Sequence, residues 1–242
     1  LRYAARIAIE WQDPKTWADK AYGESNDLTA IHSLLGLART DHSGSKQPSI
    51  DRLLKVDFQK LDKTGKLALL RTYSVIMSRA GNSSDAQTNA IGKQLDPHYP
   101  ALDDNLNEEL CRLLCYLQHP SVVSKTIALM KTTKISVPKY DPEMIKRGGN
   151  YGRTILAAMS EKVAPNVLKI HFLFCLKDVT NGWSMEQRKA YLGELKELLS
   201  KKGGNYFSGY LNKIRESAIA NVPSQDRLAL QYLTGEIKDI DL

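Results

Sequence analysis

Few residues of this chain have the types and spacing that catalysis or metal binding requires. The five histidines show no metal-site spacing, and no Cys-x-x-Cys-His haem attachment motif occurs. The chain also lacks a Gly-x-Ser-x-Gly nucleophile elbow and a His-Glu-x-x-His zinc motif. We therefore expect no catalytic residue, no metal site and no cofactor within this segment, and so no enzyme activity of its own.

The cysteines and the acidic pairs have simpler structural explanations. Cys111 and Cys115 are four residues apart, and on a helix such side chains run nearly parallel and rarely reach disulfide geometry. We expect them to be small buried side chains, as we do Cys175. The adjacent carboxylates Asp103 and Asp104 precede a helical pattern, where acidic residues favour helix capping over acid–base catalysis.

Charge and hydropathy narrow the possibilities without deciding between them. The net charge is +7, from 34 basic and 27 acidic residues, and the basic residues are spread along the chain. Solvated helix faces explain such an excess, and binding to a polyanion is the other reading. No apolar run approaches the ~18–20 residues that a membrane-spanning helix needs, so we expect no membrane span.

The residues that could act must be positioned by helices, and the run 105–131 shows the pattern most clearly. Two amphipathic stripes lie on either side of His119-Pro120, and proline suits the first turn of a helix because it has no amide to leave unbonded. The apolar positions of the two stripes are Leu106, Leu110, Leu113, Leu114, Leu117, Val122, Val123, Ile127 and Met130. The run therefore predicts a pair of antiparallel helices.

The same pattern recurs along most of the chain and predicts an all-α fold. Helices are expected at 2–12, 13–23, 27–39, 49–61, 62–80, 85–95, 142–146, 151–161, 165–178, 184–200, 206–220 and 224–235. The stretch 134–141 is expected to be an extended connector. Helix pairs of roughly 40 residues in series are typical of a HEAT-like α-α superhelix, a right-handed solenoid. We expect one repeat domain at 1–235, followed by a short acidic tail at 236–242. Because the chain begins inside a helical pattern, we expect it to be a piece of a longer protein.

A short motif occurs twice and allows two readings. Gly-Gly-Asn-Tyr stands at 148–151 and at 203–206, each time after a basic residue and before a helix. Glycine permits the positive φ that ends one helix, and asparagine can cap the next. An exposed amide turn that binds an anion is the alternative.

Aromatic and basic residues gather in the last third of the chain. A recognition surface for a partner would use such residues, while packing into helix junctions is the alternative role. The candidate partner-binding residues are Trp183, Arg188, Tyr191, Asn205, Tyr206 and Arg215.

Three segments, 106–118, 181–191 and 203–215, give the chain a family resemblance. They include the run Gly182-Trp183-Ser184 with Glu186, Gln187 and Arg188 after it, and the second Gly-Gly-Asn turn. The chain resembles the HEAT-repeat region of large exported multidomain proteins common in planctomycete-type bacteria. In that family a sugar-dehydrogenase-like β-propeller often precedes the repeats, and a cytochrome c module often follows them.

The resemblance implies a scaffold or docking domain that is exported to the periplasm. Its expected partner is a protein, either a separate one or the neighbouring propeller and cytochrome c domains of the same chain. Because neither a propeller nor a haem motif is present in these residues, no redox chemistry is assigned to them.

A nucleic-acid-binding protein of the DNA glycosylase type is the alternative. Compact basic HEAT-like proteins of this length include enzymes that hold duplex DNA in the concave groove, and the net charge and Trp11, Trp17 and Trp183 are compatible with that. No catalytic carboxylate stands beside an aromatic pocket, so nucleic acid is the less favoured partner. Basic residues lining the concave groove would favour it.

Overall fold

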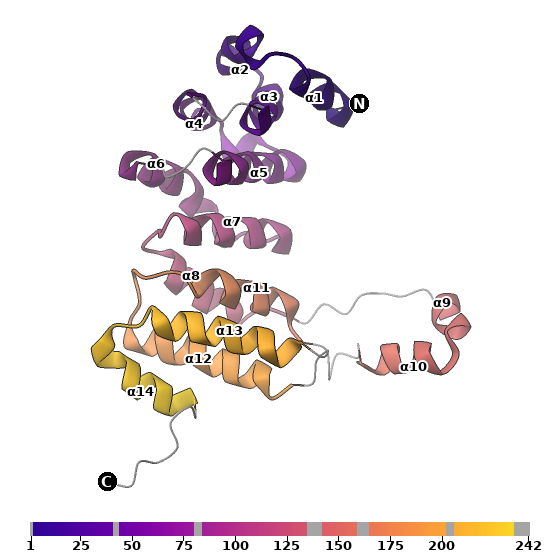
Figure 1. Ribbon diagram of the computed structural model, residues 1–242, viewed down its shortest axis with the longest axis vertical. Coiled ribbons are helices and arrows are strands. Elements are labelled where there is room, and N and C mark those ends of the chain that lie inside the picture. Colours follow the sequence, from indigo (N-terminus) through magenta and orange to yellow (C-terminus); the bar gives the residue numbers. More distant parts are fainter. Residues whose placement is uncertain are drawn as a thin grey trace. The chain divides into compact units, whose positions relative to one another are not determined.

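A computed structural model describes residues 2–40, 44–79, 84–134, 142–158, 165–201 and 206–234 (Figure 1). All regular elements in these ranges are helices and none is a strand, which confirms the all-α prediction. No helix among these residues has the length and apolar content needed to cross a bilayer. The chain divides into two compact units, Leu1–Leu117 and Gln118–Leu242, which are described separately. The single domain at 1–235 stays a prediction.

In the first unit, alternate helices pack on one another. Helices α1, α3, α5 and α7 contact each other in that order, and α2 contacts α4. The α-helices of this unit are α1 (Arg2–Glu10), α2 (Ala18–Gly23), α3 (Asp27–Thr40), α4 (Lys46–Leu53), α5 (Lys63–Arg79), α6 (Asp85–Leu95) and α7 (Asp104–Tyr116). Short 3₁₀ helices at Pro14–Thr16, Phe58–Lys60 and Asp96–His98 join some of them. The apolar faces meet in a core that contains Ile31, Leu34, Leu69 and Leu114.

Three polar side chains, of which Arg52 and Asn107 are buried and Gln94 is half-buried, join helices of the first unit through hydrogen bonds. Arg52 Nε donates to Glu24 O (2.8 Å), and its Nη2 bonds Asp27 Oδ1 (2.9 Å). Gln94 accepts from the Tyr73 hydroxyl (2.7 Å) and donates to Leu53 O (3.1 Å). The buried amide of Asn107 holds the connection before α7, as described below. These three side chains therefore add specific hydrogen bonds to the apolar packing between the helices.

The side chain of Asn107 forms two hydrogen bonds with the backbone of a single residue. Its Oδ1 accepts from Ala101 N (2.7 Å) and its Nδ2 donates to Ala101 O (2.9 Å). Helix α7 itself starts at an Asp103 cap, whose side chain accepts from Leu106 N (3.2 Å). The prediction that this acidic pair serves a helix N-terminus is therefore confirmed.

The second unit repeats the alternating arrangement. Helix α8 contacts α11 and α12, α11 contacts α13, and α12 contacts both α13 and α14, while α9 and α10 contact each other. Its helices are α8 (Val122–Met130), α9 (Pro142–Arg147), α10 (Gly149–Ala158), α11 (Val167–Leu176), α12 (Met185–Leu199), α13 (Phe207–Ala220) and α14 (Ser224–Thr234). Figure 1 shows α13 beside both α11 and α12.

Some predicted boundaries were wrong. The helix expected from Ser49 begins at Lys46, because Pro48 falls within the first turn, where its missing amide costs nothing, and Ser49 lies buried inside the helix. That helix ends at Leu53 instead of 61, and a 3₁₀ turn follows. Asn26, one residue before the predicted start of α3, accepts from Thr29 N (3.0 Å). Except for Lys134, the predicted connector at 134–141 lies outside the described residues, as does the tail at 236–242.

Candidate partner-binding surface

The turn between α11 and α12 is fixed by a glycine that cannot be replaced freely. Gly182 has φ +75°, a left-handed conformation that favours glycine. A Cβ at this position would lie 2.7 Å from Pro120 O, a backbone atom. The side chain of Gln118 holds the same turn, accepting from Thr180 N (2.9 Å) and donating to Asp178 O (3.1 Å). Gly182 and Gln118 therefore fix the backbone conformation of the turn after α11.

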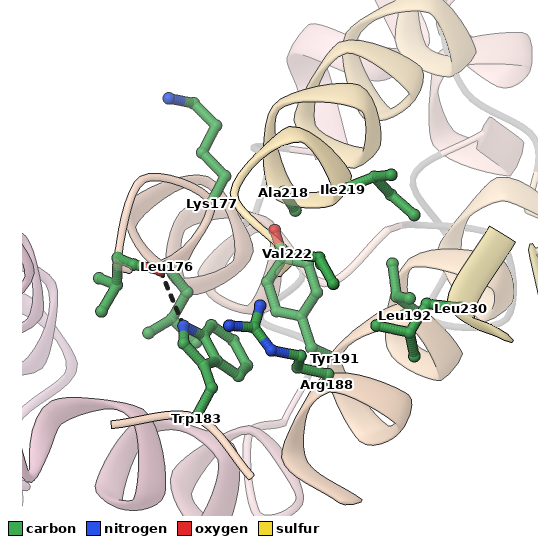
Figure 2. A pocket seen from close by; sticks show the side chains of 11 residues that line it. Leu176, Lys177, Trp183, Arg188, Tyr191, Leu192, Ala218, Ile219, Val222 and Leu230 are labelled. Carbon is green, nitrogen blue, oxygen red and sulfur yellow. Dashed lines mark hydrogen bonds between the residues drawn. The ribbon is translucent and has the colours of Figure 1, made fainter. Parts of the chain in front are cut away.

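The conformation of this turn places Trp183 between α11 and α12. Its Nε1 donates to Val179 O (2.8 Å), and its ring meets Tyr191 edge-on with centroids 5.5 Å apart (Figure 2). Tyr191 is buried, and its hydroxyl donates to Leu173 O (2.8 Å). Each aromatic ring thus packs its apolar body in the junction and satisfies its polar atom with a carbonyl.

Arg188 completes the junction in an unusual way. Its guanidinium lies 5.2 Å from the centre of the Trp183 ring, yet only 9 % of the residue is exposed. The structure gives it no ion pair or side-chain hydrogen bond with another described residue. Burial lowers the pKa of the Arg188 guanidinium, and the nearby charge of Asp226 opposes that shift. A cation–π contact is therefore its main favourable partner.

Little open space remains around these side chains. Trp183, Arg188 and Tyr191 line a cavity of about 10 Å³, which is the size of one water site. Figure 2 shows the remaining lining to be mostly apolar, with Leu176, Leu192, Ile219 and Leu230 around it. Ser184 begins α12 with a capping box, in which Ser184 Oγ accepts from Gln187 N (3.2 Å). The motif from Gly182 to Arg188 thus builds a helix junction.

A second aromatic group lies on the outside of the same unit. We call it the α11–α13 aromatic surface and define it by four exposed residues: Val167, Phe174, Tyr206 and Tyr210. The rings of Phe174 and Tyr210 stack with centroids 6.0 Å apart and an interplanar angle of 18°. They are 42 % and 44 % exposed, whereas Tyr206, one helical turn before Tyr210, is 88 % exposed. These side chains face solvent instead of the core.

The composition of α11 explains why this surface is exposed. Phe172, Leu173 and Leu176 point inward and are fully buried, but Val167 and Phe174 add apolar area on the opposite side of the helix. A helix that is apolar all round is normally covered on every side. Because the outer side of α11 is exposed among the described residues, it is a candidate surface for a binding partner.

The six predicted partner-binding residues fall into three groups. Trp183, Arg188 and Tyr191 come together in the junction, where packing occupies most of their area. Tyr206 lies on the exposed surface, and Arg215 is half-buried on α13. Asn205 lies outside the described residues. The partner-binding role of the set stays a prediction.

Phe174 was not among the residues predicted to bind a partner. The sequence signal for it was the run Ile170–Leu176, which holds more apolar residues than one helix face can bury. Tyr210 was also not among them, and the packing of α13 on α11 shows that its ring stacks on Phe174.

The charge is divided unequally between the units. Residues up to Leu117 include 15 basic and 15 acidic side chains, whereas residues from Gln118 onward include 19 basic and 12 acidic ones. The whole excess of +7 therefore belongs to the unit that carries the aromatic surface. Lys177 shows the local combination, since its Nζ lies 4.6 Å from the Phe174 ring centre and also pairs with Asp178.

Other features of the described residues offer no reactive site. They contain no group of three or more His, Cys, Asp or Glu placed to hold a metal ion. A cavity of about 460 Å³ lies between α1 and α3, but Asn26 caps α3, Ser33 bonds Thr29 O and Arg6 pairs with Glu10. Asn26, Ser33 and Arg6 of its lining thus take part in the structure of the helices.

The cysteines and the glycine turns behave as structural features. All three thiols are buried, and the Sγ atoms of Cys111 and Cys115 are 3.8 Å apart, well beyond a disulfide bond of about 2.05 Å. At the first Gly-Gly-Asn-Tyr motif, Gly149 has φ +54° and opens α10. The second motif lies outside the described residues except for Tyr206.

Comparison with known proteins gives no relative from which a function could be transferred. No family model, curated protein or solved structure matches this chain. A function must therefore be argued from the residues and their geometry.

Proposed function

We propose that this chain is a non-catalytic helical scaffold that binds a protein partner through the α11–α13 aromatic surface. The observation that carries the proposal is the exposed, stacked pair of Phe174 on α11 and Tyr210 on α13, because α11 carries apolar residues on its outer side as well as on its buried side. Exposed aromatic residues are enriched where proteins bind one another, because rigid rings bury much area for little lost entropy.

The proposal includes a HEAT-like α-α superhelix, a right-handed solenoid of antiparallel helix pairs. The alternation of contacts supports it, since helices two apart in order pack together within each unit. Small-angle X-ray scattering of the whole chain tests the arrangement. A solenoid gives the skewed pair-distance distribution of an elongated particle. A symmetric distribution, typical of a compact sphere, would refute it.

The resemblance of three sequence segments to exported planctomycete-type proteins supports the wider context that we propose. In that context the chain is part of a larger periplasmic redox protein, and its partners are a propeller and a cytochrome c module of the same polypeptide. The full reading frame around the segment tests this directly. A haem attachment motif downstream supports the context, and unrelated flanking domains contradict it.

The scaffold role is tested by binding of the flanking modules, produced separately and titrated calorimetrically into this chain. Phe174→Ser combined with Tyr210→Ser is expected to weaken binding at least about tenfold, because each ring supplies 1 kcal/mol or more at a central contact. The matched control is Tyr116→Ser on α7, where the tyrosine is 54 % exposed in the other unit. Equal affinity of the double variant and the control would overturn the surface, and turnover by the purified chain would count against a non-catalytic role.

A nucleic-acid binder of the DNA glycosylase type is the second candidate. The observation in its favour is that the entire charge excess lies in the unit that also carries exposed aromatic residues. Such a protein binds duplex DNA with an affinity that falls steeply as salt rises. A gel-shift titration at two salt concentrations separates the candidates, and the scaffold proposal expects no salt-sensitive shift.

A further inference from the structure

We infer that the segment bound by the α11–α13 aromatic surface is an acidic stretch of polypeptide, with aromatic or other apolar side chains flanked by carboxylates. This inference rests on the proposed function, to which it adds the chemistry of the partner. It follows from three observations: the apolar face, the charge of the unit that carries it, and the way its cations are already paired.

The apolar face sets the first requirement. Phe174 and Tyr210 stack on each other and leave more than two fifths of each side chain exposed, and Val167 and Tyr206 extend the surface along both helices. Covering this area with apolar or aromatic side chains removes it from water, which is the main source of binding energy at such a surface. A partner that is purely polar would leave that energy unused.

The net charge of the second unit sets the second requirement. The unit from Gln118 onward contributes 19 basic against 12 acidic residues, so an approaching acidic segment is attracted and a basic one repelled. Lys213 lies close to one helical turn after Tyr210, is exposed, and makes no ion pair with a described residue. It is placed to meet a carboxylate beside the aromatic pair.

The pairing of the other cations favours polypeptide over nucleic acid. Lys169 Nζ bonds Glu194 Oε2 (2.6 Å), and Lys177 pairs with Asp178 while lying over Phe174. A phosphate backbone needs a row of available cations along its path. On α11 and α13, Lys213 is the exposed cation without an ion pair among the described residues. One or two carboxylates beside apolar anchors match this surface better than a run of phosphates.

The test uses fluorescence polarisation with four labelled probes and the whole chain. The probes are a random copolymer of glutamate and tyrosine, polyglutamate, a copolymer of lysine and tyrosine, and oligothymidylate. We expect the glutamate–tyrosine copolymer to bind most tightly. Phe174→Ser with Tyr210→Ser should weaken this binding at least about tenfold. Lys213→Glu should weaken it about threefold, as expected for an exposed charge pair. Tyr116→Ser is the control and should change nothing.

Each outcome separates the inference from the function on which it rests. The inference is overturned if oligothymidylate or the lysine copolymer binds at least as tightly as the glutamate–tyrosine copolymer, or if polyglutamate binds equally well. It is also overturned if Lys213→Glu strengthens copolymer binding. If one of these results is found while the Phe174→Ser, Tyr210→Ser variant still binds the flanking modules more weakly than wild type, the surface binds a partner but does not select acidic segments. If the double variant binds both the flanking modules and the glutamate–tyrosine copolymer as tightly as wild type, the proposed function is wrong as well. Far-ultraviolet circular dichroism shows that each variant retains its helices.

Discussion

Arg52 and Arg188 are both buried at helix junctions, one in each unit, but their charges are satisfied differently. Arg52 donates to the carbonyl of Glu24 and pairs with Asp27 at 2.9 Å. Arg188 has a tryptophan ring 5.2 Å away, while Asp226 lies beyond ion-pair distance. The two residues have nearly the same exposed fraction, 7 % and 9 %. Burial alone therefore does not define what an arginine contributes.

The difference teaches how each junction is built. In the first unit the guanidinium is a hydrogen-bonding fork that joins α4 to the turn before α3, so its geometry matters. In the second unit the Arg188 guanidinium lies over the Trp183 ring, and much of its contribution to stability comes from packing. Substitutions that keep the length and remove the charge should therefore act unequally on the two residues.

The largest effect is expected from Arg52→Met. Methionine fills a similar volume but leaves Glu24 O and the partly exposed Asp27 carboxylate without their donor. We expect a loss of about 3 kcal/mol in the free energy of unfolding. Chemical denaturation followed by circular dichroism measures it. A loss below 1 kcal/mol would mean that the fork contributes no more than apolar packing does.

Gly182→Ala should give the next largest effect and shows what holds the second junction. Alanine is strained at φ +75°, and its Cβ would meet Pro120 O at 2.7 Å, so we expect a loss of about 2 kcal/mol. Gly65→Ala is the matched control in the first unit. Its Cβ would approach the flexible Leu28 side chain at 2.9 Å, within a helix of ordinary φ. If the control were as costly as Gly182→Ala, crowding instead of backbone conformation would be the cause.

Arg188→Met should change stability by less than about 1 kcal/mol in either direction. The substitution removes a cation–π contact but also a charge that burial disfavours, and these two effects offset each other. The same denaturation experiment as for Arg52→Met makes the comparison direct. If the two methionine variants lost the same free energy of unfolding, the proposed difference between the hydrogen-bonded Arg52 and the stacked Arg188 would be wrong.

The smallest effect concerns an exposed pair and is seen through pH. The hydrogen bond from Lys63, at 2.6 Å, is the main cause that lowers the pKa of Asp103 below its ordinary value of 3.8. A carboxylate whose pKa is lower in the folded state stabilises the protein at pH values above its unfolded-state pKa. This contribution is lost as the pH falls through the folded-state pKa. Wild type should lose slightly more stability than Lys63→Met on acidification, by less than about 0.5 kcal/mol. A larger loss in Lys63→Met would contradict the assignment.

Helix existence and several caps could be predicted from local sequence, because spacing and capping chemistry act within one or two turns. Asp103 and Ser184 are examples. The start of α4 could not, since Pro48 is equally compatible with a loop and with a first turn. The division of the aromatic residues was also beyond reach. Whether Trp183 or Phe174 faces solvent depends on which neighbouring helices cover it, and the sequence does not state that contact.

The buried thiols give this protein an internal gauge of local opening. Cys111 and Cys115 lie in one unit and Cys175 in the other, and a water-soluble maleimide can reach each of them only when the surrounding helices part. Labelling rates under native conditions, resolved by peptide mass spectrometry, would therefore report the opening free energy of the two halves independently. No cysteine has to be engineered into the chain for that measurement.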